Sequence, residues 1–266
     1  MRVADEAQQI LEYSSQLEAK SAELARTARQ LRDANAKLTD LSAQKDAFLS
    51  QISHELRTPM TSIRAFSEIL RESDLAEEER ARFAGVIHDE AIRLTRLLDD
   101  LLDLSALENA SVTLDLSTVT LSDLLDRAEA AAGVIGARGG LVVHRDRVAE
   151  AGLLLRTDAD RLVQVFVNII GNARKYCDAP EPALTIIPAS LPDGLQVDFV
   201  DNGAGIPEKS REIIFEKFSR LSDTAAAGGT GLGLAICREI VARLGGDIRY
   251  LPGQGGAGFR LRLPRV

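Results

Sequence analysis

The first 45 residues carry an apolar position that recurs every seventh residue, in a segment without glycine or proline. The companion position that a coiled coil also needs is mostly polar, with Lys20 and Thr27 among its members. So narrow a stripe suits the seam between two helices better than a broad core face, so the pattern favours a marginal coiled coil. A single amphipathic helix packed on a globular body is the alternative. The repeating positions are Ile10, Leu17, Leu24, Leu31 and Leu38.

The helical period continues past residue 45 and predicts a helical hairpin. One apolar stripe runs from Phe48 to Leu70, and the polar stretch 71–74 separates it from a second stripe. A lone hairpin with one strong stripe per helix buries both stripes poorly, whereas two copies bury them in a four-helix bundle. The pattern therefore predicts a homodimer. The second stripe consists of Phe83, Ile87, Ala91, Leu94, Leu98 and Leu101.

After Leu107 the pattern changes to short β-branched runs that alternate with helices and glycine-rich turns. This alternation is typical of one sheet with helices on one face. The expected strands are 112–116, 141–148, 153–156, 184–188, 195–200, 247–251 and 258–263. The expected helices are 121–132, 158–176 and 231–244.

Composition and charge narrow the classes of protein. Hydrophobic residues make up 45% of the chain but aromatic residues only 4%, which predicts aliphatic cores. The net charge of −8 argues against a nucleic-acid binder, which needs a basic face. No apolar run approaches the ~20 residues of a membrane span, and the charged N-terminus is not a signal peptide. We expect a cytoplasmic fragment whose parent protein could be attached to the inner membrane, with Cys177 and Cys237 as reduced, buried thiols.

The first candidate site surrounds His54. This histidine falls between two core positions of its helix and should point away from the bundle core. Thr58 lies one turn further on the same face, and Pro59 removes a backbone hydrogen bond, which predicts a bend or weak point. A neutral imidazole oriented by a carboxylate such as Glu55 is a competent nucleophile toward phosphorus. A lone exposed histidine is more often without function, so the assignment depends on the rest of the chain.

Three side chains on one face of the predicted helix 158–176 suit a nucleotide and its metal ion. Asn168, Asn172 and Lys175 follow one another at spacings of four and three residues. Side-chain amide oxygens suit Mg²⁺, and a neighbouring lysine suits phosphate oxygens. A polar helix face in water is the alternative for this segment taken alone.

Two glycine-rich turns could bring backbone close to a ligand. Asp201 ends a predicted strand before Gly203 and Gly205, and its carboxylate can accept a hydrogen bond from an amino group such as that of adenine. Further on, glycines open an apolar helix, where free N–H groups form an anion site. The second turn is neither a dinucleotide fingerprint nor a Walker A loop, and the first turn taken alone could be an ordinary tight turn. The glycines of the second turn are Gly229, Gly231 and Gly233.

In order, and with the segment of residues 215–220 (Phe-Glu-Lys-Phe-Ser-Arg) between the two glycine-rich turns, these segments resemble the H, N, G1, F and G2 boxes of the bacterial two-component sensor histidine kinases, over residues 46–266. The resemblance implies an α+β chain in three parts. A coiled-coil signalling helix at 1–45 precedes a dimerisation and phosphotransfer hairpin at 46–109, which forms a dimeric four-helix bundle. A Bergerat-type ATP-binding α/β sandwich follows at 110–266. The sensor domain would lie upstream, outside this chain.

The resemblance also implies an activity. His54 would take the γ-phosphate of ATP and pass it to an aspartate in the receiver domain of a response regulator. Glu55 would orient the imidazole and aid proton transfer, and Thr58 would serve a phosphatase activity. Chaperone, topoisomerase and mismatch-repair ATPases share the ATP-binding half but lack the upstream histidine helix. A catalytically silent dimeric scaffold of the same fold is the second hypothesis.

For the nucleotide site, the resemblance assigns ATP and Mg²⁺ as cofactors. Asn172 would bind the Mg²⁺, Asn168 and Lys175 would line the phosphate side, and Asp201 would read adenine. Arg220 would lie near the phosphates, on a lid formed by the small residues that follow it. The nucleotide-loop glycines would be Gly203, Gly205, Gly229, Gly231 and Gly233.

Overall fold

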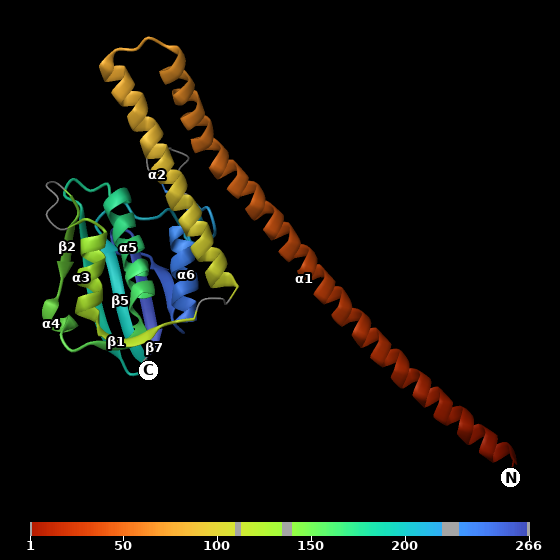
Figure 1. Cartoon of the computed structure of the whole chain (residues 1–266). Coiled ribbons are helices and arrows are strands. Elements are labelled where there is room, and N and C mark those ends of the chain that lie inside the picture. Colours follow the sequence, from red (N-terminus) through yellow and green to blue (C-terminus); the bar gives the residue numbers. More distant parts are fainter. Residues whose placement is uncertain (1, 110–112, 135–139, 220–228, 265–266) are drawn as a thin grey trace. The chain divides into compact units, whose positions relative to one another are not determined.

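The computed structural model describes residues 2–109, 113–134, 140–219 and 229–264 (Figure 1). The chain forms two compact units, Met1–Arg57 and Thr58–Val266. Helix α1 (Arg2–Glu72) makes up the described part of the first unit and continues into the second. Pro59 lies inside this helix without ending it.

The sevenfold apolar repeat forms an uncovered row along α1. Four of its leucines are 67%, 70%, 70% and 65% exposed. A row of leucines left in water on one helix is what a second helix would cover in a coiled coil. These leucines are Leu17, Leu24, Leu31 and Leu38.

The second unit begins with the helical hairpin, in which the end of α1 is joined to α2 (Glu77–Glu108) by a short turn (Figure 1). The rings of Phe66 and Phe83 stack across the hairpin with their centroids 5.3 Å apart. Leu97, Leu104 and Leu107 are the buried residues of α2. None of the three belongs to the apolar stripe predicted for this helix.

This difference has a physical reason. Helix α2 packs against helix α6 (Gly233–Arg243) of the α/β part, and its buried residues lie outside the periodic stripe. Leu98 of the predicted stripe stays 45% exposed. Helix α2 therefore has two apolar faces, of which the periodic pattern revealed one.

The α/β part contains two sheets rather than the single sheet predicted. A five-stranded sheet has the order β2-β4-β5-β7-β6, with β2 and β4 parallel and the other neighbours antiparallel. Strands β1 and β3 form a separate antiparallel pair, in which Leu116 lies opposite Asp158. The strands are β1 (Leu116–Thr120), β2 (Val142–Arg145), β3 (Leu154–Asp158), β4 (Ala183–Leu191), β5 (Gly194–Asp201), β6 (Asp247–Leu251) and β7 (Gly258–Pro264).

Two predicted strands were misplaced. The strand expected at 112–116 is found at Leu116–Thr120, where it pairs with β3, and residue 112 lies outside the described residues. The strand expected at 141–148 ends at Arg145 and is followed by the short helix α4 (Arg147–Glu150). Asp146 caps α4 by accepting hydrogen bonds from two backbone N–H groups, and the completely buried Glu150 pairs with Arg145 at 2.5 Å. Capping and ion pairing outweighed the apolar alternation.

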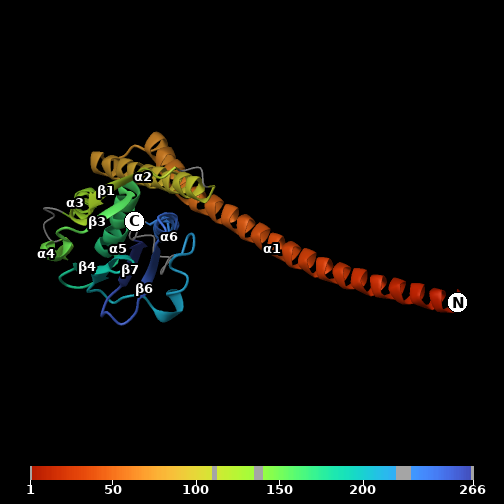
Figure 2. The same ribbon diagram turned by 90° about the horizontal axis from the view of Figure 1, so that it is seen from below.

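Helices α3 (Leu121–Ala131), α5 (Ala159–Tyr176) and α6 cover one face of the five-stranded sheet (Figures 1 and 2). Between these layers the rings of Phe166 on α5 and Phe199 on β5 lie 5.3 Å apart. The other face of the sheet carries a two-armed ion pair, which joins Arg260 on β7 to Asp198 on β5 at 2.8 and 2.6 Å. The apolar core therefore lies between the sheet and these helices, and the residues at the ends of β5 and α5 form a candidate site.

Candidate functional site

The loop that opens α6 lies against the polar face of α5. Asn168 donates a hydrogen bond from its side-chain amide to the carbonyl oxygen of Gly233, over 3.5 Å. A methyl group added at Gly229 would lie 2.9 Å from the Tyr176 hydroxyl and 3.2 Å from Lys175 Nζ. The structure thus brings the second glycine-rich turn to the helix face that carries the predicted phosphate-side residues.

The first glycine-rich turn meets the same end of α5. A methyl group at Gly203 would lie 3.1 Å from Asp178 Oδ1, just beyond that helix, and the backbone N–H of Ala204 donates to the same oxygen at 2.8 Å. Asn202 fastens the turn further, since its Oδ1 accepts from the backbone N–H of Ala183 and its Nδ2 donates to the carbonyl oxygen of Glu181. Sequence reasoning singled out neither Asp178 nor Asn202 as a fastening residue, because the partners that show it are distant in the sequence.

Asp201 holds a fixed carboxylate at the end of β5. It is 8% exposed, and its Oδ1 accepts hydrogen bonds from the backbone N–H groups of Gly203 at 3.0 Å and Ala257 at 2.8 Å. Both of its hydrogen bonds within the described residues use Oδ1, which leaves Oδ2 for a ligand donor. A rigid, nearly buried acceptor of this kind suits the amino group of a purine.

Two of the motif glycines are required by the backbone itself. Gly205 has φ +77°, and a methyl group there would lie 3.0 Å from the carbonyl oxygen of Gly256. Gly231 has φ +73°, and its methyl group would lie 2.8 Å from the backbone of Phe218. Only glycine adopts these conformations without strain in so little space. The turns therefore owe their shape to packing within the protein.

Helix α2 reaches the second glycine-rich turn through a half-buried carboxylate. Thr230 Oγ1 donates a hydrogen bond to Asp100 Oδ2 at 2.7 Å. Burial raises the pKa of the Asp100 carboxyl above its ordinary 3.8, and the bond from Thr230 only partly opposes that shift. Asp103, one turn further on, accepts hydrogen bonds from Arg161 at 3.2 Å and Gln164 at 2.8 Å. No motif predicted these contacts between the hairpin and the α/β part.

His54 belongs to the first unit and is exposed on α1. Its neighbour Glu55 is half-buried, and Gln51 donates a hydrogen bond to Glu55 Oε1 at 3.3 Å. Thr58, the first residue of the second unit, is exposed one turn beyond His54 on the same helix. The residues predicted to bind the nucleotide belong to the second unit. Arg220 and the proposed lid that follows it lie outside the described residues.

The two cysteines differ. Cys237 is buried in α6, and burial raises the pKa of its thiol to about 12. Cys177 is half-exposed and donates a weak hydrogen bond to Asn202 Oδ1 at 3.1 Å, so the prediction of a buried thiol is wrong for it. Within the described residues, no helix is both long enough and apolar enough to span a membrane.

Two family models match this chain in series. Residues 44–110 match the His Kinase A (phospho-acceptor) domain, and residues 157–266 match the histidine kinase-, DNA gyrase B- and HSP90-like ATPases. The gyrase-like and HSP90-like members of the second family are excluded by the phospho-acceptor domain that precedes it. The chain belongs to the two-component sensor histidine kinases.

Individual sensor kinases support this assignment. The sensor protein KdpD of Escherichia coli K12 is 35% identical over 225 residues, which are 83% of this chain and 24% of KdpD. The full-length ShkA structure in complex with AMPPNP is 26% identical, with a TM-score of 0.57 over 82% of this chain and 45% of that one. The histidine kinase ThkA in complex with the response regulator TrrA shares the fold, with a TM-score of 0.67 and 22% identity over 83% of this chain and 61% of that one.

These comparisons bear on fold and ligand. The predicted class, a helical hairpin followed by a Bergerat-type α/β domain, is confirmed. The α/β part is an ATP-binding domain of this family. The chain spans about a quarter of the length of KdpD.

Proposed function

We propose that this chain is the catalytic core of a sensor histidine kinase, which phosphorylates His54 with ATP and passes the phosphoryl group to a response regulator. The observation that carries the proposal is the exposed His54 beside Glu55 within the phospho-acceptor match, on the same chain as an ATP-binding domain. The proposed parts are a signalling helix at 1–45, a phosphotransfer hairpin at 46–109 and a catalytic domain at 110–266.

The chemistry assigns each side chain at the histidine one step. The unprotonated imidazole nitrogen of His54 attacks the γ-phosphorus, and the bond from that phosphorus to the bridging oxygen breaks, which releases ADP. The imidazole then loses its remaining proton, and Glu55 orients the ring and receives that proton. Thr58, one turn away, would place a water for dephosphorylation of the partner. In the second transfer, a carboxylate oxygen of the regulator attacks the phosphorus and the bond to His54 breaks.

The nucleotide would lie between α5 and the two glycine-rich turns. Asp201 would accept from the adenine amino group beside Gly203 and Gly205, and Lys175 would approach phosphate oxygens beside Asn168. The half-buried side-chain oxygen of Asn172 is a hard ligand that fits Mg²⁺, and bound Mg²⁺ would neutralise phosphate charge. Arg220 is proposed for the lid side, and the second turn contributes Gly229, Gly231 and Gly233.

The proposed partners are a response regulator and a second copy of this chain. ThkA was solved with the response regulator TrrA, which supports a receiver domain as the acceptor. The uncovered leucine row of α1, together with Leu98 and Leu102 of α2 at 45% and 70% exposure, supports a homodimer.

Labelled ATP tests the proposal directly. Incubation with Mg²⁺ and γ-labelled ATP should give an acid-labile, base-stable phosphate on the chain. His54→Gln should abolish the label, while His88→Gln, which changes another exposed histidine on α2, should keep it. Normal labelling of His54→Gln would show that the acceptor is misassigned. No labelling of the parent chain would leave the silent scaffold as the better hypothesis.

A further inference from the structure

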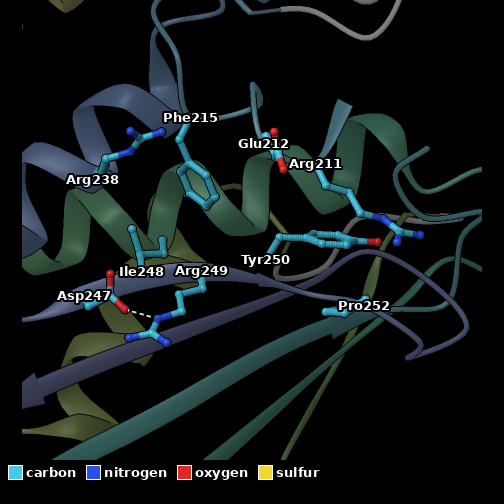
Figure 3. A pocket seen from close by; sticks show the side chains of 9 residues that line it. All are labelled: Arg211, Glu212, Phe215, Arg238, Asp247, Ile248, Arg249, Tyr250 and Pro252. Carbon is cyan, nitrogen blue, oxygen red and sulfur yellow. Dashed lines mark hydrogen bonds and ion pairs between the residues drawn. The ribbon is translucent and has the colours of Figure 1, made fainter. Parts of the chain in front are cut away.

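A hollow of about 500 Å³ lies between the segment 211–215, helix α6 and edge strand β6 (Figure 3). Arg211 and Tyr250 face each other on one side of it, and the Arg211 guanidinium lies 5.5 Å from the centre of the Tyr250 ring. Tyr250 also meets the Phe259 ring edge to face, with the centroids 6.1 Å apart. The family motifs of this chain include neither Arg211 nor Tyr250.

Both side chains grip the same residue of the turn. The backbone N–H of Ile206 donates to the Tyr250 hydroxyl at 3.3 Å, and Arg211 Nε donates to the Ile206 carbonyl oxygen at 3.1 Å. Since Arg211 and Tyr250 also contact each other, the three residues form a closed set of contacts, called here the Ile206 clamp. Ile206 is 8% exposed, so the clamp holds its main chain where the side chain is already buried.

The position of the clamp gives it a role. Ile206 directly follows Gly205, whose φ is +77°, and the same turn begins at Asp201. Glycines give this turn more conformational freedom than other residues would, and ordering it costs free energy whenever a ligand needs one shape. A clamp that orders the turn beforehand removes that cost from binding.

We propose that Tyr250 and Arg211 are positioning residues, which hold residues 201–206 in the conformation that binds adenine. The inference rests on the proposed ATP site. It assigns a role in nucleotide affinity to two side chains that would not touch the phosphates, so the turnover of bound ATP should not depend on them.

Tyr250→Phe is the most direct test, because it removes the hydroxyl and keeps the ring, its contact with Phe259 and its contact with Arg211. The dissociation constant for AMPPNP and the KM for ATP should each rise about 3- to 10-fold, as expected for one lost hydrogen bond. The rate of His54 labelling at saturating ATP should stay within about twofold of the parent. A role in overall stability alone would instead lower the melting temperature and the amount of active protein, with KM unchanged.

Arg211→Lys and Arg249→Gln complete the experiment. The first keeps the positive charge but lacks the Nε donor, so it should raise KM as Tyr250→Phe does. The double variant Tyr250→Phe/Arg211→Lys should lose less affinity than the product of the losses in Tyr250→Phe and Arg211→Lys, because the clamp acts as a unit. Arg249 lines the same hollow on β6 but pairs with Asp247, and its variant should bind AMPPNP like the parent.

The outcomes separate this inference from the kinase proposal. Unchanged AMPPNP affinity in both clamp variants, with normal labelling of the parent, overturns the clamp and leaves the kinase proposal intact. A fall in labelling rate at saturating ATP also overturns it, since these residues would then act in the transfer step. Failure of the parent chain to bind AMPPNP overturns the ATP site and the clamp together.

Discussion

At the scale of single residues, the two carboxylate oxygens of Asp201 are expected to have different roles, one in holding the turn and one in binding the ligand. Its Oδ1 takes two backbone N–H groups, whereas Oδ2 is proposed to face adenine. In Asp201→Asn the amide oxygen can keep both backbone bonds, while the NH₂ group opposes the adenine amino donor. We expect at least a tenfold loss of ATP affinity, from the lost charge-assisted bond and the opposed donors, with little change in melting temperature.

Asp201→Ala is the matched variant, because it removes both oxygens. It should lose affinity to a similar extent and also lower the melting temperature, since two buried N–H groups lose their acceptor. Isothermal titration with AMPPNP and calorimetric melting measure the two effects. Parent-like affinity in Asp201→Asn would remove this carboxylate from the proposed site.

Residue identity was predictable where the chemistry is local in sequence. Asp201 and the glycines beside it form one short segment, so their types and spacing indicate a ligand turn. Tyr250 accepts a hydrogen bond from the N–H of Ile206, 44 residues away, and no pattern in its own segment indicates that contact. Sequence patterns reveal contacts that follow a period and miss those that only tertiary packing creates.

At the scale of elements, the junction of α2 with the ATP-binding domain predicts a pH effect. The pKa of Asp100 is raised mainly by burial, so the folded chain binds a proton there more tightly than the unfolded chain. As pH rises from about 3.8 through the folded pKa, the carboxyl ionises and the folded chain becomes less stable, because the half-buried site favours the protonated form. Asp100→Asn keeps an acceptor for Thr230 without a charge. The difference between its melting temperature and that of the parent should therefore increase as pH rises over that range, and the variant should melt higher at pH 7.

Melting by calorimetry from pH 3.5 to pH 7 checks this expectation. Asp89→Asn, an exposed change on the same helix, should track the parent at every pH in that range. A difference between Asp100→Asn and the parent that does not vary with pH would mean that this carboxyl is not the titrating group.

The same junction shows why elements were predicted better than their packing. The helical period gave both helices of the hairpin but assigned one apolar face to α2, although Leu97, Leu104 and Leu107 form another. A periodic stripe is a single-face signal, and a helix shared by two neighbours exceeds it. Likewise, apolar alternation extended β2 into α4, where Asp146 and Glu150 decide the structure.

At the scale of the whole molecule, α1 is continuous from Arg2 to Glu72 and includes His54. We predict that the N-terminal helix conveys the input by rotation or by a shift of register along its weak seam. Each residue inserted near Asn35 rotates the downstream helix by about 100°. The labelling of His54 should therefore rise and fall with helical phase and recover near an insertion of seven residues.

A series of one to eight inserted alanines, with labelling measured after each, is the test. Alanine keeps the helix intact, so changes in labelling report phase rather than melting. A steady decline with insertion length, or no dependence on it, would reduce this helix to a tether.

The uncovered leucine row has one more consequence, for how the chain behaves on dilution. An N-terminal helix whose row of described leucines faces water gains little from folding alone, so in the proposed homodimer most of its stability would come from the second copy. Order in the N-terminal helix is then a property of the population, set by mass action rather than by the single chain. Below the dissociation constant of the pair, a kinase of this design would fall silent without any signal, simply because its molecules had become too few to meet.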